Sequence, residues 1–484
     1  MEGHGSRHKK TRAAFWLRMG ARGIGVVVAT LLLIATALVA YALQYPATFR
    51  FVRVPNPLSG NNPTYPLIAA PVPAVGAASF DSRFKTIQTR VTQTNQINSR
   101  HEYSRFDPFN VDQSMILLLD TGGGYNIYRT RTMPYNQTAN FVRHIVLSEA
   151  RWDPANPRLL WALEGYTIVT LDAVSNAKTV IKNFAADAVI GPIISSNPVY
   201  RITTREEGEA SLDKRYWALI LQGDDRADYK ALYIFTWDRL QNRVLGVRPL
   251  VGSDRDVDWV GMSVLGNWVL MGADPTGTGT IRGLVMANKA LTQLHTVGTA
   301  IGHCDVGLDV YGREVLVGQN ANTDYIDMIS IAWNTRPVDS ASAYAGSGTT
   351  PLIRLYYNSG SSYGLGSGVH ISCNYPGYAV VSTCTPPGVL DRNWLDRTVT
   401  LVRLDQMRPY VFYLAKLHNT TQEEPRAYWE ETHAAIANDG KRVVWADNWG
   451  QNLGQEQMFL MQLDMPPNWT SFLAASARRW ESYR

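Results

Sequence analysis

Short apolar runs recur along the chain and alternate with polar, turn-forming stretches. Seven of these runs open a repeating unit, at residues 114–120, 158–164, 215–221, 266–272, 312–318, 377–383 and 441–447. A second apolar run follows each of them, at residues 126–133, 166–173, 231–238, 282–289, 324–332, 399–405 and 458–464. Turn signals such as Asp439-Gly440 stand just before several of the first runs. Paired short runs bounded by such turns predict β-hairpins.

The repetition of this hairpin predicts the architecture. Units that recur at intervals of roughly 40–60 residues, each with about four short strands, are typical of a β-propeller. A single unit cannot bury both faces of its sheet, whereas packing around a closed ring buries both and protects the sheet edges. A β-sandwich or two unrelated β domains would not repeat the hairpin seven times. We therefore predict an all-β, seven-bladed β-propeller.

A different pattern occupies the N-terminal region. Residues 23–43 form an uncharged apolar stretch, long enough as a helix to cross the ~30 Å hydrocarbon core of a membrane. Basic residues concentrate before it, which predicts a cytoplasmic N-terminus and an exported remainder in the periplasm or outside the cell. The A-x-A-like residues 40–42 leave a cleaved signal peptide as the alternative, although its apolar region would be unusually long. We expect a single-pass signal anchor.

Proline dominates the stretch between this segment and the first repeat. Residues 44–80 contain seven prolines, which disfavour regular strands and helices and favour a semi-extended spacer. The predicted organisation is therefore a basic cytoplasmic tail at 1–22, a transmembrane anchor at 23–43, a proline-rich linker at 44–80 and the propeller at 81–484.

Charge and cysteine content change this picture only slightly. The net charge of +5 arises within residues 1–22, which hold six basic residues and one acidic residue, so the remainder is neutral. A nucleic-acid-binding domain needs a basic surface, and we therefore expect no nucleic-acid partner. Three cysteines, Cys304, Cys373 and Cys384, are too few for a disulfide scaffold. An exported compartment would still permit a bridge between Cys373 and Cys384.

The first residues of each innermost strand should face the central channel at one mouth of the ring. At these positions every unit carries an acidic residue or a histidine: His101, Glu149, Glu209, Asp258, His303, His370 and His433. The last three come from consecutive units. Imidazoles with a nearby carboxylate, here Asp305 or Glu431, suit a divalent manganese, iron or zinc ion.

Other interpretations of the same positions remain open. The polar groups could simply hydrogen-bond backbone and water in a wet channel. A mixed site with Cys304 or Cys373 is a weaker alternative, because odd spacing turns each cysteine away from its neighbouring histidine. Trp259 and Trp429 lie beside the channel positions and could stack on sugar rings.

Two segments give the repeat a resemblance to known proteins. Residues 432–443 (THAAIANDGKRV) and 209–218 (EASLDKRYWA) resemble the exported TolB-like and oligogalacturonate-lyase-like propellers over about residues 95–465. The lyase resemblance implies a metal held by histidines and a glutamine at the propeller mouth, and cleavage of uronate chains by β-elimination. The paired histidines of that pattern and its glutamine are missing here. His101, Arg105 and Arg151 are the candidate catalytic residues by position alone.

These observations lead to one expected function and two alternatives. We expect a membrane-anchored extracytoplasmic propeller that binds a protein partner or a surface carbohydrate, with a divalent metal at the channel mouth as an option. One alternative is a metal-dependent carbohydrate lyase, so the sequence leaves open whether the protein is an enzyme. The other alternative is an accessory subunit of a larger membrane complex.

Overall fold

The computed structural model describes residues 51–59, 62–94, 100–120, 122–224, 230–355, 369–384, 394–419, 430–450, 458–471 and 473. Residues from Phe51 onward form one compact unit, and residues 1–50 form another. The predicted tail and the apolar segment 23–43 therefore lie outside the described residues. Among the residues that are described, no helix has the length and apolarity to cross a membrane.

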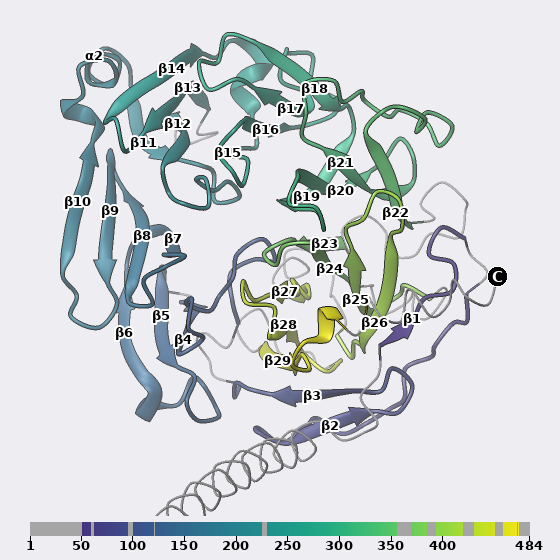
Figure 1. Cartoon of the computed structure of the whole chain (residues 1–484). Coiled ribbons are helices and arrows are strands. Elements are labelled where there is room, and N and C mark those ends of the chain that lie inside the picture. Colours follow the sequence, from purple (N-terminus) through teal and green to yellow (C-terminus); the bar gives the residue numbers. More distant parts are fainter. Residues whose placement is uncertain are drawn as a thin grey trace, which may run out of the picture. The chain divides into compact units, whose positions relative to one another are not determined.

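The described residues form seven β-sheets that follow one another around a ring, as the sequence repeat predicts (Figure 1). Blade one contains β4 (Met115–Leu119), β5 (Tyr125–Arg129) and β6 (Phe141–Ile145). Blade two contains β7 (Ser148–Trp152), β8 (Leu159–Glu164), β9 (Thr167–Asp172) and β10 (Lys178–Asn183). Blade three contains β11 (Val199–Thr203), β12 (Tyr216–Gly223), β13 (Ala231–Asp238) and β14 (Arg243–Pro249). Blade four contains β15 (Trp259–Met262), β16 (Val269–Ala273), β17 (Gly283–Ala287) and β18 (Leu294–Gly298).

The remaining three blades complete the ring. Blade five contains β19 (Ile301–Leu308), β20 (Glu314–Asn320), β21 (Tyr325–Ser330) and β22 (Thr349–Arg354). Blade six contains β23 (Val369–Ser372), β24 (Tyr378–Thr383), β25 (Thr398–Arg403), β26 (Tyr410–Lys416) and β1 (Val52–Arg53). Blade seven contains β27 (Ala435–Ile436), β28 (Arg442–Asp447), β29 (Phe459–Asp464), β3 (Thr86–Arg90) and β2 (Ala78–Asp81). Short helices η1 (Thr138–Asn140), η2 (Phe184–Ala186), α2 (Ile190–Ser196) and η3 (Gly252–Asp256) lie in the connections.

The seventh blade is built from both ends of the sequence. β3 pairs antiparallel with β29, and β2 continues the same sheet as its edge strand. The N-terminal strands thus join the C-terminal hairpin, and the ring is closed by main-chain hydrogen bonds. This closure was not predicted, because the β2–β3 hairpin lies before the first recognisable repeat.

The proline-rich segment is not a free spacer from Phe51 onward, which corrects the expectation for residues 44–80. β1 pairs with β26 at the outer edge of blade six, and Val54 is fully buried in the core beside it. Tyr65 packs edge-on against Phe84 and Tyr413, with ring centroids 5.3 Å apart in both pairs. Proline is tolerated near β1 because β1 is an edge strand. An edge strand needs hydrogen-bond partners for its backbone on one side only.

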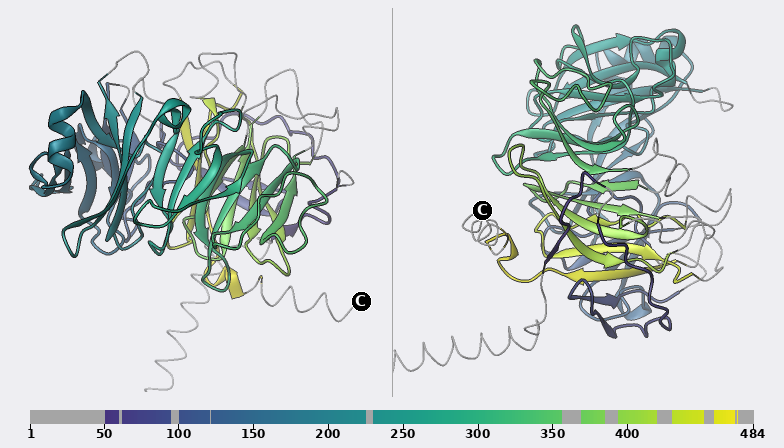
Figure 2. Two further views of the ribbon diagram at one scale, coloured as in Figure 1. Left: turned by 90° about the horizontal axis from the view of Figure 1, so that it is seen from above. Right: turned by 90° about the vertical axis from the view of Figure 1, so that its right-hand side faces the viewer.

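Apolar side chains that alternate along the strands pack between neighbouring blades. One core cluster joins Trp161 of blade two to Trp217 and Phe235 of blade three. Another joins Ile220 of blade three to Val260 of blade four. Each such buried side chain contributes about 1.5–3 kcal/mol, so the ring is stabilised by its inter-blade seams. Figure 2 shows the neighbouring sheets standing side by side in two further views.

Candidate functional site

Three buried side chains converge where blades six and seven meet. His370 lies on β23, the inner strand of blade six, and Glu431 and His433 precede β27, the inner strand of blade seven. The Oε2 atom of Glu431 lies 3.1 Å from Nε2 of His370 and 3.4 Å from Nε2 of His433. The possible ligand atoms of this His370–Glu431–His433 cluster all lie within 4.8 Å of one another.

Local hydrogen bonds fix the two chain segments that carry the cluster. The hydroxyl of Ser382 accepts a hydrogen bond from the Ala434 amide, and the hydroxyl of Ser372 accepts one from the Ile436 amide, each at 3.1 Å. Serines of blade six thereby hold the start of β27 in blade seven. His433 has a φ angle of +46°, a backbone conformation that is uncommon for a non-glycine residue and recurs at functional sites.

Two residues outside the repeat surround His433. The guanidinium of Arg100 donates a hydrogen bond to Nδ1 of His433, and Nε2 of His101 donates one to the His433 carbonyl at 2.5 Å. Because a guanidinium can only donate, Nδ1 of His433 must accept, and the proton of the neutral ring then lies on Nε2. Burial and the neighbouring His370 and Arg100 lower the pKa of His433 well below its ordinary value.

The cluster matches a divalent metal site in its donors and spacing. Donor atoms at about 2.0–2.2 Å from one ion lie roughly 3–3.5 Å from each other, which agrees with the two distances to Glu431. Neither ring nitrogen of the buried His370 makes a hydrogen bond to any described residue. A buried imidazole without hydrogen bonds is costly unless something else engages it. Arg100 opposes metal binding, because its positive charge lies beside His433 and its hydrogen bond favours the proton on Nε2.

A pocket of about 400 Å³ adjoins the cluster between blades four and five. Tyr103 and His303 belong to its lining and also contact the cluster. The His303 ring lies 5.6 Å from that of His370, and the Tyr103 ring lies 5.5 Å from His370 and 5.0 Å from His433. His303 and Tyr103 therefore lie between the pocket and the cluster. Burial lowers the pKa of His303 to about 4, so its imidazole is neutral at pH 7.

Arg105 lines the pocket, and several neighbours contact its guanidinium group. Its Nη2 lies 2.9 Å from Oε2 of Glu207, and its Nη1 donates to the Glu207 carbonyl at 2.8 Å. Its guanidinium carbon lies 4.7 Å from the ring centroid of Trp259, close enough for a cation–π contact. Nη2 also donates to Sγ of Cys304 at 3.5 Å.

The structure separates the predicted metal ligands. His370 and His433 lie in the cluster, as does Glu431, whereas His303 faces the neighbouring pocket and Asp305 faces the backbone. The Asp305 carboxylate accepts hydrogen bonds from the Cys373 amide at 2.6 Å and the Val306 amide at 2.8 Å. Burial raises the pKa of Asp305 to about 8. Asp305 therefore joins blades five and six.

The other predicted site residues lie in several different places. Asp258 and Trp259 line the pocket, as does Arg105. Glu149 instead accepts hydrogen bonds from Thr203 and Thr204, which ties blade two to blade three. His101 donates a hydrogen bond to the His433 carbonyl, and burial lowers the pKa of His101 to about 3. Trp429 lies outside the described residues.

Arg151 and Glu209 take part in a separate polar network. Arg151 lies 2.7 Å from Glu102 and 3.9 Å from Glu209, and its guanidinium covers the ring of Phe106 at 3.3 Å. Glu209 borders a smaller pocket, and neither residue lines the pocket beside the histidines. We find no direct role for Arg151 at the cluster.

Sequence reasoning missed Arg100, Tyr103 and Glu102, which all precede the first regular strand of blade one. The only available signal was the high proportion of polar and aromatic residues around His101. Without a strand repeat there, nothing indicated which of them point to the channel.

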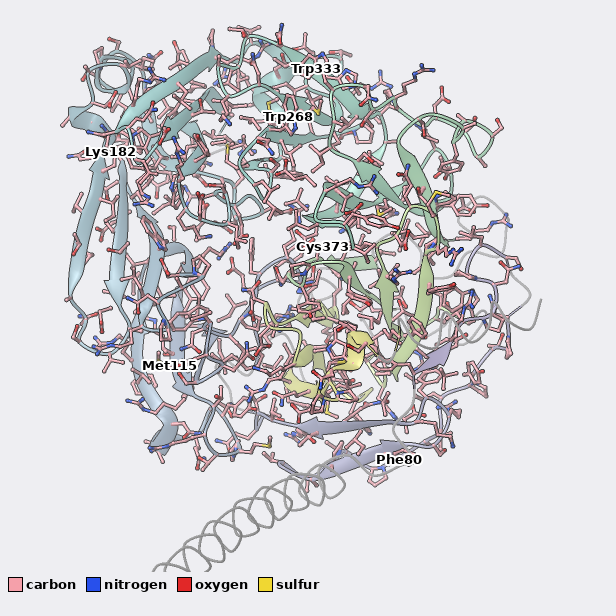
Figure 3. All side chains as sticks on the ribbon, in the orientation of Figure 1. Phe80, Met115, Lys182, Trp268, Trp333 and Cys373 are labelled. Carbon is pink, nitrogen blue, oxygen red and sulfur yellow. The ribbon has the colours of Figure 1, made fainter. Side chains whose placement is uncertain are left out.

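The cysteines are unbonded, buried thiols, so the anticipated bridge between Cys373 and Cys384 is absent. Burial raises the pKa of Cys304 to about 12 and that of Cys373 well above its ordinary value. None of the three cysteines belongs to the His370–Glu431–His433 cluster, which argues against a mixed cysteine and histidine site among the described residues. Figure 3 shows Cys373 toward the middle of the ring, whereas Phe80 and Lys182 lie at its rim.

Comparisons with known proteins support the architecture. No protein-family model matches the sequence, and no curated protein matches it. Among solved structures, the oligogalacturonate lyase of Vibrio parahaemolyticus is similar, with a TM-score of 0.50 and 11% identity over 81% of this chain and 97% of that one. An oligogalacturonate lyase in complex with manganese is equally similar, with a TM-score of 0.50 and 11% identity over 82% of this chain and 97% of that one. At this identity the likeness shows a shared seven-bladed propeller fold.

Proposed function

We propose that this propeller binds a divalent metal at the His370–Glu431–His433 cluster and a carbohydrate in the adjoining pocket. One observation carries the proposal. His303 and Tyr103 line the pocket of about 400 Å³ and also contact the rings of the cluster. A ligand in the pocket would therefore lie one side chain away from the metal, next to His303 and Tyr103. Pockets of about 300–1,000 Å³ with a few convergent polar groups are typical of small-molecule sites.

The donor set indicates the kind of metal. Two imidazoles and one carboxylate suit manganese, iron or zinc better than calcium or magnesium. The similar lyase crystallised with manganese makes that ion the first to test. When bound, such an ion polarises a ligand oxygen as a Lewis acid. The chain itself contributes the pocket walls, the Arg105–Glu207 pair and the neutral imidazole of His303.

A lyase activity is the second candidate, favoured by the state of His303. His303 lines the pocket and is neutral at pH 7, so it can accept a proton from a ligand held there, although its pKa of about 4 makes it a weak base. Elimination from a uronate would also need a cation to hold the substrate carboxylate. Arg105 is already bound to Glu207, so the binding function is better supported than the lyase.

We further propose that the chain is exported and anchored by residues 23–43. The support is the length of this uncharged segment and the basic residues concentrated before it. The propeller would then face the periplasm or the exterior, where surface carbohydrates and membrane partners are accessible. An accessory role in a membrane complex fits the same anchor.

The metal dependence of carbohydrate binding tests the proposal. Full-length protein in detergent would be loaded with manganese and titrated calorimetrically with a panel of neutral, amino and uronic oligosaccharides, before and after chelation. We expect binding of at least one class that weakens more than tenfold on chelation and in Glu431→Gln. The matched control Asp112→Asn alters an exposed carboxylate outside the pocket and should bind normally. Equal binding with and without metal, or no binding in the panel, would refute the proposal.

A further inference from the structure

The pocket beside the cluster has a distinctive charge pattern. Four carboxylates line it, from Glu207, Asp256, Asp258 and Asp274, against one guanidinium, that of Arg105. A cluster of acids is common on any surface, so the partners of each group decide whether the pocket carries a net charge.

Two of the carboxylates are neutralised within the fold. Glu207 forms an ion pair with Arg105 at 2.9 Å, and Asp256 forms one with Lys230. Asp258 and Asp274 are exposed and form no ion pair with any described residue. The pocket therefore retains the charge of two carboxylates, with no cation left to hold an anionic ligand.

Asp258 is a pocket carboxylate without an ion pair to any described residue, and it interacts electrostatically with Glu207. It precedes Trp259 at the start of β15, and its charge helps to raise the pKa of Glu207, although burial of Glu207 is the larger cause. The negative charges of Asp258 and Glu207 therefore repel each other. A cation between them would relieve this repulsion.

His303 is an independent sign that the pocket is built for a ligand. Its side chain is largely buried, it lines the pocket, and it makes no hydrogen bond to any described residue. The centroid of its ring lies 5.6 Å from that of His370, with the two rings nearly perpendicular. A neutral imidazole offers one donor and one acceptor, a combination that suits hydroxyl groups.

We propose that the pocket selects a carbohydrate that carries a protonated amine, with Asp258 as the residue that recognises the ammonium group. This inference rests on the proposed function, because it specifies the carbohydrate class of the same pocket. Hydroxyl groups would pair with His303, the sugar ring would lie against Tyr103 and Trp259, and the ammonium would lie between Asp258 and Glu207. A uronate would instead place its carboxylate among these acids.

Three trisaccharides distinguish the classes by calorimetry on manganese-loaded full-length protein at about pH 6, where a sugar amine is protonated. They are the β-1,4 trimer of glucosamine, its N-acetylated counterpart of nearly the same shape, and trigalacturonate. We expect the glucosamine trimer to bind at least tenfold more tightly than the other two. Asp258→Asn should abolish this preference, so that the glucosamine trimer and the acetylated trimer bind with similar affinity. Asp112→Asn should leave the preference intact.

The outcomes separate this inference from the proposed function. Equal or tighter binding of trigalacturonate or the acetylated trimer would overturn the amine preference and leave a carbohydrate site in place. A preference that persists in Asp258→Asn would overturn the role of that residue. If none of the trisaccharides binds but another oligosaccharide does, this inference falls alone. If no oligosaccharide binds, the proposed function falls as well.

Discussion

At the scale of single residues, the orientation of one histidine ring governs what the cluster can hold. Arg100 donates to Nδ1 of His433, and the proton of the neutral ring then lies on Nε2, 3.4 Å from Oε2 of Glu431. Metal-binding histidines usually donate their second nitrogen to a carbonyl or carboxylate, which leaves a lone pair for the ion. Arg100 reverses this arrangement and adds a positive charge. It is therefore the strongest competitor of a metal ion in the site.

Removal of this competitor should strengthen metal binding. In Arg100→Met the Nδ1 atom of His433 can take the proton, and Nε2 becomes available to an ion. We expect the affinity for zinc or manganese to rise at least severalfold over the wild type in a calorimetric titration. Arg100→Lys, which keeps the charge and a donor, serves as the matched control and should not gain affinity. Unchanged or weaker binding in Arg100→Met would show that the guanidinium does not oppose the ion.

A second buried group, the carboxylate of Asp327, should make the stability of the folded protein depend on pH. The Asp327 carboxylate is fully buried and accepts hydrogen bonds from Asn320, Thr323 and Tyr344. Burial raises its pKa to about 7, above the ordinary value of about 3.8. Between these two values the folded state holds a proton that the unfolded state has lost, so stability falls as the pH rises through this window.

Asp327→Asn should remove this contribution, since an amide does not titrate. We expect the melting temperature of the wild type to fall relative to that of the variant between pH 4.5 and pH 7.5, with no further relative change at higher pH. Thermal unfolding followed by circular dichroism at several pH values measures the difference. Parallel curves for the two proteins would mean that Asp327 is ionised throughout.

At the scale of strands, the sequence predicted each hairpin of the repeat and failed where the repeat stops. Apolar runs at 215–221 and 231–238 became β12 and β13, because alternation and turn residues are local signals. β1 and β3 were missed, because they are short and their partners lie hundreds of residues away. The same limit applies to the site. Strand position identified His370 and His433, whereas Arg100 and Tyr103 lie in irregular backbone before blade one.

The unpredicted strand β3 should be essential to the ring. Gln88 lies in the middle of β3, between β2 and β29. Gln88→Pro removes an amide from the ladder, and proline in a central strand is strongly unfavourable. We expect a loss of roughly 1–3 kcal/mol of unfolding free energy or more, because a buried ladder carbonyl loses its hydrogen bond. Gln88→Thr keeps the amide and favours a strand, so it should cost far less. Comparable losses in a denaturant titration would contradict closure through β3.

At the scale of the whole molecule, the ring explains why residues distant in sequence form one site. Blades five, six and seven follow one another in the ring (Figure 1), so β19, β23 and the segment before β27 bring His303, His370 and residues 431–433 together. The hydrogen bonds of Ser372 and Ser382 across blades six and seven hold this geometry. The fold thus supplies a rigid rim, and a few side chains on it determine the chemistry.

The metal content of the full-length protein tests the central claim most directly. Protein equilibrated with manganese, zinc or iron and dialysed would be analysed by elemental mass spectrometry, beside His370→Ala and His303→Ala. We predict about one equivalent of metal in the wild type and in His303→Ala, and its loss in His370→Ala. A folded wild type without metal would contradict the account, and so would an equal metal content in all three proteins.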